Sequence, residues 1–287
     1  MPAPTAEQLK GHYDRMSRSG EVVSRCKMWL PQLIEGLTVL DLGCRRGKGV
    51  YHIADRVGAQ GKAIGLDWTP EFIEDARAHA AENVQFGEDG EPNMEFVVGY
   101  PEATGLADDS VDVVVMNSVF NLACDPAAVL REAWRVLKPG GELYFAMVVT
   151  PYELPPEVRS RYLELGNSFG CAPSFQEYFD MFDTAGFTCR YVFDMAIPSK
   201  APVDELNVLP TVEFYEGVVR SFKVTGYAAE DEERAAVAVY RGGEGMPDTF
   251  VLEDGAAFAC GEEVAVSANT ARTLTQSRLA AFFEVRG

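Results

Sequence analysis

Residues 38–51 read Thr38-Val39-Leu40-Asp41-Leu42-Gly43-Cys44-Arg45-Arg46-Gly47-Lys48-Gly49-Val50-Tyr51. An aliphatic run ends in an acid, a turn rich in glycine follows, and the next residues can begin a helix. This pattern is typical of the first strand, loop and helix of a nucleotide-binding α/β sheet. Glycine is used where the backbone turns sharply or approaches a ligand closely. Arg45 follows Cys44, and no full G-x-G-x-x-G pattern is present, which disfavours a dehydrogenase.

A second strand is predicted at Ala63–Asp67, and it also ends in an acid. An acid about 20 residues beyond the glycine loop can accept hydrogen bonds from the hydroxyl groups of a ribose. Trp68 follows Asp67 directly. Its ring can either stack on an adenine or pack in the core, and the sequence favours neither.

Three more strands follow at regular intervals, and each is followed by a helix or a loop. We predict them at Met94–Tyr100, Val111–Met116 and Glu142–Val148, with helices beginning at Thr69 and Asp125 and a tight turn at Leu137–Gly141. Such alternation predicts a doubly wound parallel sheet, which binds ligands outside the carboxyl ends of its strands. The polar residues at or just past those ends are Asp41, Asp67, Tyr100 and Asn117.

The regions on either side of this sheet differ from it in pattern. Residues 1–36 are predicted to be helical, because Leu9, Tyr13 and Met16 recur at helical spacing, and they form either a lid over a cofactor or a packing helix. A strand at Cys189–Met195 is predicted to join the sheet. Shorter strands are predicted at Ala235–Tyr240, Thr249–Leu252 and Ala281–Val285. We therefore predict a helical segment at 1–36, a main domain at 37–200 and a smaller α+β domain at 201–287.

Composition limits the partners and the compartment. The net charge is -19 and the pI is about 4.6, which disfavours nucleic acids and anionic membranes as partners. No run of 18 apolar residues and no signal-peptide pattern is present, so we expect a cytoplasmic protein. Six scattered cysteines and three scattered histidines favour reduced thiols and predict no metal site. The oligomeric state is not indicated.

Several segments together resemble known enzymes. The acid-Leu-Gly loop, the acid at Asp67 and Leu137-Lys138-Pro139-Gly140-Gly141 look like a class I S-adenosylmethionine (SAM) methyltransferase. The resemblance narrows to arsenite methyltransferases, and it extends from about residue 22 to the end of the chain. The segments that carry it include Gly99-Tyr100-Pro101-Glu102, Phe214-Tyr215, Arg220-Ser221-Phe222-Lys223 and Ser277-Arg278-Leu279. It implies a Rossmann-like class I methyltransferase sheet with a smaller C-terminal α+β domain, and SAM as the cofactor.

The resemblance also implies a set of cofactor-binding residues. They are Asp41, Gly43, Cys44, Arg45, Gly47, Asp67, Trp68, Tyr100, Glu102 and Asn117. Arg45 stands where the family has glycine, and its side chain either reaches the methionine carboxylate of SAM or points to solvent. Glu102 either approaches the adenine amino group or only begins a helix. Cys44 is a packing residue in the family and is given no chemistry.

The departures from the family concern the methyl acceptor. Arsenic(III) prefers thiolate ligands, and the resemblance implies cysteines where this chain has Cys26, Ser118 and Ser168. A serine hydroxyl is a poor ligand for a soft atom, and one thiolate cannot form a two- or three-coordinate arsenic site. Either the site accepts something else, with Asn117, Ser118 and Ser168 around it, or Cys124 and Cys171 lie beside Cys26. We favour the first explanation.

We therefore predict an enzyme, a SAM-dependent methyltransferase that acts on a small molecule other than arsenite. A soft sulfur, selenium or nitrogen nucleophile is favoured, because transfer to a soft lone pair needs no general base. The candidate residues around the acceptor are Asn117, Ser118, Ser168 and Cys26. Two alternatives stay open: a true arsenite methyltransferase with relocated cysteine ligands, and a SAM-binding protein that has lost its activity.

Overall fold

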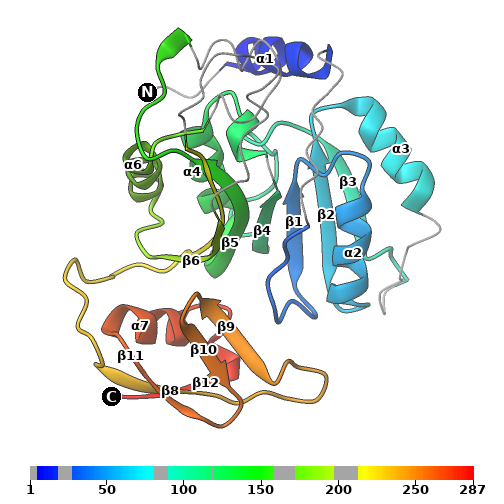
Figure 1. Ribbon diagram of the computed structural model, residues 1–287. Coiled ribbons are helices and arrows are strands. Elements are labelled where there is room, and N and C mark those ends of the chain that lie inside the picture. The colour runs from blue at the N-terminus through cyan, green and yellow to red at the C-terminus, as the bar shows by residue number, and fades with distance from the viewer. Residues whose placement is uncertain (1–4, 19–27, 81–89, 118, 158–171, 197–212) are drawn as a thin grey trace.

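A computed structural model describes residues 5–18, 28–80, 90–117, 119–157, 172–196 and 213–287 of the 287-residue chain. Figure 1 shows a main sheet with helices on both sides and a smaller unit beyond one end of it. Among the described residues, no helix combines the length and the apolar character needed to cross a membrane.

The main sheet has seven strands in the order β3-β2-β1-β4-β5-β7-β6. Its strands are β1 (Thr38–Leu42), β2 (Lys62–Asp67), β3 (Met94–Val98), β4 (Val111–Asn117), β5 (Leu137–Val149), β6 (Arg190–Ala196) and β7 (Tyr215–Phe222). Strands β1 to β5 are parallel to one another, and β7 is antiparallel to both β5 and β6. The strand order reverses between β1 and β4, which is where such sheets bind ligands. The doubly wound Rossmann-like fold is confirmed.

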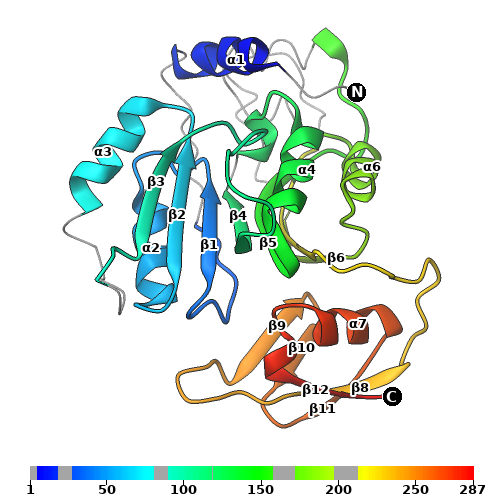
Figure 2. The same cartoon turned by 180° about the vertical axis from the view of Figure 1, so that it is seen from behind.

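Helices cover both faces of this sheet, because the apolar side chains of its strands point alternately to one face and the other. Val39 and Ala63 face α2 (Lys48–Val57) and α3 (Pro70–Ala80), in one buried cluster. Leu40 and Leu66 face α4 (Pro126–Val136) and α6 (Phe175–Ala185), in the other. Successive residues of a strand point to opposite faces, so a continuous apolar strand needs a helical layer on each side. Figure 2 shows the same layers from behind.

The smaller unit is the C-terminal α+β unit, and it is confirmed. It contains the sheet β11-β8-β12, the hairpin β9-β10 and one helix. Their bounds are β8 (Ala236–Tyr240), β9 (Thr249–Glu253), β10 (Ala256–Ala259), β11 (Glu263–Val266), α7 (Ala268–Gln276) and β12 (Phe283–Arg286). Its core includes Tyr240, Phe250 and Phe283, and it continues into Tyr191 of β6 and Phe222 of β7. The unit therefore shares its core with the main sheet.

The N-terminal region is only partly helical. Helix α1 (Ala6–Arg18) is present, and it lies above one end of the sheet in Figures 1 and 2. Residues 28–36 form no helix, so the helical prediction for residues 1–36 is wrong over this stretch. Pro31 has no backbone N–H to donate within a helix. This segment instead reaches toward the C-terminal unit, where Gln32 Nε2 donates to Thr249 O at 3.1 Å.

Two differences from the expected strands concern the far side of the sheet. The predicted turn at Leu137–Gly141 belongs to β5, which carries a shift in register opposite β4 and a left-handed glycine, Gly140 (φ 79°). Strand β7 was not foreseen, and it lies inside the range 201–287 that the sequence assigns to the C-terminal domain. Its position between β5 and β6 puts it in the main sheet. The division into three domains stays a prediction.

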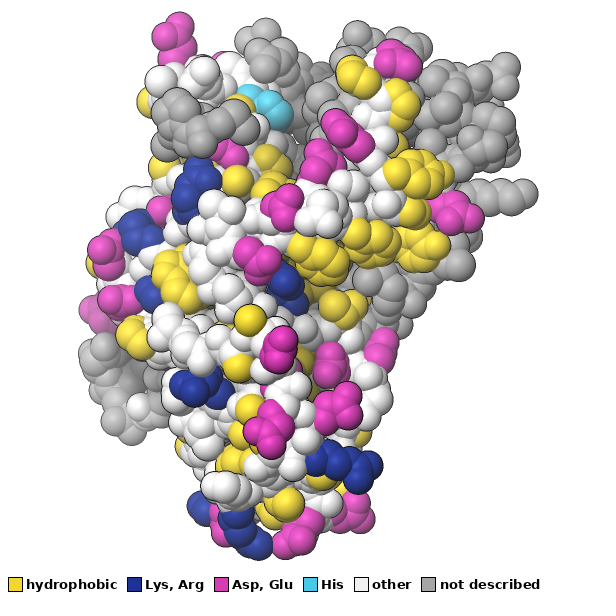
Figure 3. All heavy atoms as spheres, turned by 90° about the vertical axis from the view of Figure 1, so that its left-hand side faces the viewer, with side chains coloured by type: hydrophobic (Ala, Val, Ile, Leu, Met, Phe, Trp, Pro, Cys, Tyr) yellow, Lys and Arg dark blue, Asp and Glu magenta, His cyan; other side chains and the backbone are white. Residues whose placement is uncertain are grey.

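Helix α6 has one aromatic row in the core and another nearer the surface. Tyr178 and Phe182 are buried, whereas Phe179 is exposed and stacks with Phe175. Figure 3 shows this side of the molecule, where hydrophobic side chains form a band and acidic and basic side chains are interspersed around it. Tyr215 of β7 extends the aromatic contacts of Phe175. Helix α6 thus packs its buried aromatic row against the sheet and leaves Phe179 at the surface.

Candidate functional site

The carboxyl ends of β1, β2 and β4 bring together three of the predicted polar residues. Asp41 is the fourth residue of β1 and pairs with Gly65 of β2 and Val115 of β4. Asp67 ends β2, and Asn117 ends β4. Asp41 and Asp67 are 5% and 1% exposed, so both carboxyl groups are withdrawn from water. Two buried acids at the point where the strand order reverses form the centre of the candidate site.

The loop between β1 and α2 has the backbone shape that its glycines suggest. Gly43, Arg45 and Gly47 all adopt left-handed conformations, with φ of 79°, 51° and 80°. A Cβ at Gly43 would collide with the Val119 side chain, and a Cβ at Gly47 would lie 2.8 Å from Phe96. Glycine is therefore required at both positions by backbone conformation and by space.

Asp67 holds this loop in place. Its Oδ2 accepts a hydrogen bond from the Arg45 backbone N–H at 2.9 Å, and its Oδ1 accepts one from the Thr69 N–H at 2.9 Å. Burial raises the pKa of Asp67, and these two hydrogen bonds act in the opposite direction. Each carboxylate oxygen has a second lone pair, so Asp67 can also accept from a ligand hydroxyl group.

Asp41 differs from Asp67 in its surroundings. Among the described residues, no donor hydrogen-bonds its carboxyl group. Burial, and secondarily the charge of Asp67, raise the pKa of Asp41 to about 7. A Cβ on Gly49 would lie 2.7 Å from Asp41 Oδ2 and 2.9 Å from Met28 Cε, which shows how closely the loop and Met28 pack around this acid. A cationic group on a ligand fits a buried carboxylate to which no described residue donates.

Trp68, Tyr100 and Glu102 lie together, and the residue that joins them was not among the predicted site residues. Tyr13 of α1 stacks on Trp68, with ring centroids 4.3 Å apart, and on Tyr100 at 5.4 Å. Its hydroxyl donates to Glu102, with both carboxylate oxygens at 3.0 Å. The helical spacing of Leu9 and Tyr13 indicated an apolar face, but it did not indicate which partners that face would meet.

Asn117 is engaged by the segment that precedes β1. Its Oδ1 accepts from the Trp29 backbone N–H at 3.1 Å, and its Nδ2 lies 3.3 Å from Met28 Sδ. Asn117 therefore positions residues 28–29 beside Asp41. Contact of Asn117 with cofactor or acceptor stays a prediction.

Two loop side chains remain, those of Arg45 and Cys44. The Arg45 guanidinium lies 5.8 Å from the ring centroid of Phe72 on α3. The Cys44 thiol is buried, and burial together with the neighbouring Asp41 and Asp67 raises its pKa far above the usual range. A thiol of that kind stays protonated, which fits a packing role. The roles of Gly43, Cys44, Arg45 and Gly47 toward a cofactor stay predictions.

The predicted acceptor residues Cys26, Ser118 and Ser168 lie outside the described residues, as does Cys171. Within the described ranges, no group of three or more His, Cys, Asp and Glu side chains is arranged to hold a metal ion. Cys124 is half-buried, and its backbone N–H donates to Glu102 Oε1 at 2.8 Å.

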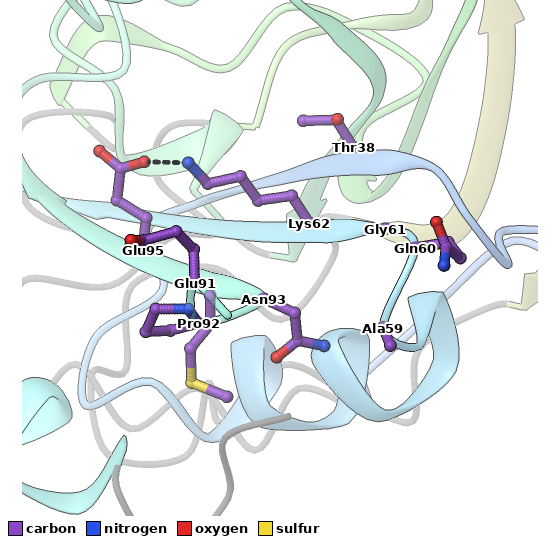
Figure 4. Close-up of a pocket in the computed structure, with 10 residues that line it drawn as sticks. Thr38, Ala59, Gln60, Gly61, Lys62, Glu91, Pro92, Asn93 and Glu95 are labelled. Atoms are coloured by element: carbon purple, nitrogen blue, oxygen red, sulfur yellow. Dashed lines mark ion pairs between the residues drawn. The ribbon is translucent and has the colours of Figure 1, made fainter. Parts of the chain in front are cut away.

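A hollow of about 630 Å³ lies at the opposite end of the sheet (Figure 4). The first residues of β1, β2 and β3 line it, namely Thr38, Lys62 and Met94, and Lys62 pairs with Glu95 at 2.6 Å. Parallel sheets bind ligands at the carboxyl ends of their strands, and this hollow is at the amino ends. We therefore place the candidate site at Asp41 and Asp67.

The chain is similar to known methyltransferases in both sequence and structure. Residues 33–186 match the model of a methyltransferase domain. An arsenite methyltransferase from Aquipseudomonas alcaligenes is 36% identical over 272 residues, covering 91% of this chain and 76% of the relative. The human arsenite methyltransferase is 31% identical over 265 residues, covering 91% and 70%.

A solved structure matches the whole chain. It is an arsenic(III) S-adenosylmethionine methyltransferase from Chlamydomonas reinhardtii, 32% identical, with a TM-score of 0.81. The match covers 100% of this chain and 97% of that one. The likeness thus includes the C-terminal α+β unit as well as the main sheet.

Proposed function

Since the chain belongs to the arsenite methyltransferase family of SAM-dependent methyltransferases, we propose that it methylates a small-molecule acceptor other than arsenite. The observation that carries this proposal is in the sequence: Ser118 and Ser168 stand where the family resemblance implies cysteines. Hydroxyl groups do not replace thiolates as ligands of a soft atom. A soft sulfur, selenium or nitrogen nucleophile fits such a site better than arsenic(III).

The described cysteines support this proposal. Cys189 packs against the core of the C-terminal unit, and Cys260 is exposed in that unit. Cys44 is buried in the loop with a strongly raised pKa. Of these thiols, none is both near the paired acids and disposed to ionise. Arsenic ligation by this chain would therefore depend on Cys26, Cys124 and Cys171.

The residues at the carboxyl ends of the strands fit SAM. In our proposal Asp67 accepts from the ribose hydroxyls, and Asp41 faces the positive charge of the methionine ammonium group. Trp68 and Tyr100 border the adenine, and Glu102 accepts from its amino group. When bound, SAM supplies a methyl group on a sulfonium, which is both the electrophile and the source of the leaving group.

The transfer is an in-line displacement. A lone pair of the acceptor forms a bond to the methyl carbon while the carbon–sulfur bond breaks and its electrons stay on sulfur. The chain has to align the acceptor and exclude water, and a soft nucleophile without a proton needs no base. We propose that Asn117, Ser118, Ser168 and Cys26 surround the acceptor and that the reaction takes place in the cytoplasm.

Arsenite is the second candidate acceptor, and the relatives favour it. The bacterial, human and algal proteins described above are arsenic or arsenite methyltransferases at 31–36% identity. This candidate requires Cys26, Cys124 and Cys171 to form the arsenic site together.

An acceptor screen with methyl-labelled SAM separates the two candidates. The purified protein is incubated with arsenite and glutathione, and in parallel with thiols, thioethers, selenium compounds and amines. We expect labelled organic products and no methylarsenicals. Methylarsenicals as the main product would contradict the proposal, and their loss in C26S, C124S and C171S variants would identify the ligands. If the protein binds SAM but forms no methylated product, the third hypothesis, a SAM-binding protein that has lost its activity, is supported instead.

A double variant sharpens the test. Ser118→Cys with Ser168→Cys restores the thiols that the resemblance implies, so it should gain arsenite methylation. The matched control, Ser118→Ala with Ser168→Ala, removes the hydroxyls without adding thiols, and it should lose the organic activity without gaining the arsenite activity. If the unmodified protein already methylates arsenite as fast as the cysteine variant, the serines do not decide the acceptor.

A further inference from the structure

Tyr13 is buried in the part of the site that the proposed function gives to the adenine. Its ring is 2% exposed and nearly parallel to its neighbours, at 29° to Trp68 and 17° to Tyr100. Trp68 directly follows Asp67, so a ribose bound to Asp67 has its base beside the Trp68 ring. The phenol ring of Tyr13 already lies there.

The hydroxyl of Tyr13 also makes the contact that a nucleobase would make. It donates to Glu102, whose carboxylate is 8% exposed and also accepts from the Cys124 N–H. An adenine amino group is a donor of similar reach at the edge of a flat ring. Burial, and secondarily the charge of Glu102, raise the pKa of Tyr13 beyond its usual range, so the hydroxyl keeps its proton.

Among the described side chains of helix α1, few are buried. Between Ala6 and Asp14, Leu9 and Tyr13 are the buried residues, and the rest are exposed or half-buried. A His12 ring nitrogen lies 2.8 Å from the Leu122 carbonyl oxygen and adds one polar contact. Gly11 lies within the helix, where glycine lowers helix stability. A helix held in this way can leave its position without disturbing the core of the sheet.

We infer that Tyr13 occupies the adenine position when α1 is docked on the sheet and that α1 withdraws when SAM binds. This inference rests on the proposed cofactor site. The phenol ring competes with the adenine within the same molecule, so the apparent affinity for SAM is reduced by the fraction of molecules in which α1 is docked. The helix then regulates cofactor binding, and the loss of Tyr13 should strengthen binding. A ring that merely covered the bound adenine would have the opposite effect.

Calorimetry with S-adenosylhomocysteine tests the inference without depending on turnover. Four proteins are compared: the unmodified chain, Tyr13→Ala, Tyr13→Phe and Lys10→Ala. We expect at least fivefold tighter binding by Y13A and an intermediate gain by Y13F, which keeps the ring and loses the bond to Glu102. Lys10 is exposed on the same helix and pairs with Asp14, so K10A should bind like the unmodified chain.

Amide hydrogen exchange gives a second measurement. S-adenosylhomocysteine should increase exchange in residues 6–18 and decrease it in residues 41–50. Weaker binding by Y13A, or greater protection of α1 in the complex, overturns this inference and leaves the proposed function standing. If none of the four proteins binds S-adenosylhomocysteine while all are folded by circular dichroism, the proposed cofactor site and this inference fail together.

Discussion

Glu142 and Arg278 are 136 positions apart in the chain, yet Arg278 Nε donates a 2.6 Å hydrogen bond to Glu142 Oε2 in the interior. The other carboxylate oxygen accepts from Arg220 Nε at 2.7 Å. Arg278 also donates to the backbone carbonyls of Gln32 and Leu33. One buried cluster therefore joins β5, β7, the C-terminal unit and residues 28–36. The same segment contacts Asn117 through Trp29.

Removing one member of this cluster should destabilise the whole protein. In Arg278→Met the two backbone carbonyls lose this donor, and Glu142, which is 0% exposed, keeps Arg220 as its one described ion-pair partner. Breaking a buried ion pair from one side costs about 3–5 kcal/mol of unfolding free energy. Urea denaturation measures it. Arg286→Met removes the exposed pairs with Glu263 and Glu284 and is the control, for which we expect little change. Equal effects of the two substitutions would contradict this account.

The raised pKa of Asp41 predicts a pH dependence of stability. The folded protein holds the Asp41 proton up to about pH 7, whereas the unfolded chain releases it near its ordinary value of 3.8. The folded state therefore binds more protons between these values, and the contribution of Asp41, complete below about pH 4, is lost as the pH rises through 7.

Asp41→Asn removes this dependence. The unfolding free energy of the variant minus that of the unmodified chain should rise between pH 4 and pH 8, by up to roughly 4 kcal/mol for a shift of about three pKa units. Denaturation at four pH values measures the difference. A difference that does not vary with pH would show that Asp41 is ionised throughout.

Gly43 and Gly261 separate the cost of a positive φ from the cost of a steric clash. Both have a φ of 79°. A Cβ at Gly43 would collide with Val119, whereas a Cβ at Gly261 has no atom within 4 Å. Gly43→Ala should therefore cost about 1–3 kcal/mol more than Gly261→Ala, in addition to weakening S-adenosylhomocysteine binding. Thermal unfolding and calorimetry on both variants check this. Equal losses would mean that the loop yields to the added methyl group.

Arg45 is expected to affect stability more than cofactor binding. Its φ of 51° is unfavourable for a residue with a side chain, and its guanidinium faces Phe72. Arg45→Gly should relieve roughly 1 kcal/mol of strain, while Arg45→Ala keeps the strain and loses the contact with the ring. The glycine variant should thus unfold at a higher temperature than the alanine variant, with similar S-adenosylhomocysteine affinities. A tenfold loss of affinity in both would instead assign the guanidinium to the cofactor.

The positions of Asp41 and Asp67 follow from local sequence, because buried parallel strands appear as apolar runs and their last residues lie at one edge. Strand β7 gives no such signal. It carries the charged Arg220 within an inner strand, and that charge is tolerated because Glu142 lies beside it and the Val251 carbonyl accepts a hydrogen bond from it. At Pro139-Gly140-Gly141 the local sequence instead predicts a turn where the structure has a strand. Residues typical of a turn are accommodated as an irregularity within β5.

The contact between Tyr13 and Glu102 could not be predicted from the local sequence, for a different reason. The two residues are 89 positions apart, and each has an ordinary local explanation, Tyr13 as part of an apolar helix face and Glu102 as the start of a helix. Only the packing of α1 on the sheet brings them together. The same holds for Asn117 and Trp29, which are 88 positions apart.

The insertion of β7 between β5 and β6 also has a consequence for how the protein is made. The ribosome releases residues 190–196 before residues 215–222, although the later segment separates the earlier one from β5. During translation β5 therefore presents an unpaired edge until Phe222 has emerged. An unpaired edge strand in a nascent chain is a site for pairing with other chains. Slower translation between β6 and β7 would lengthen that exposure, so aggregation of newly made protein should depend on codon usage in this interval.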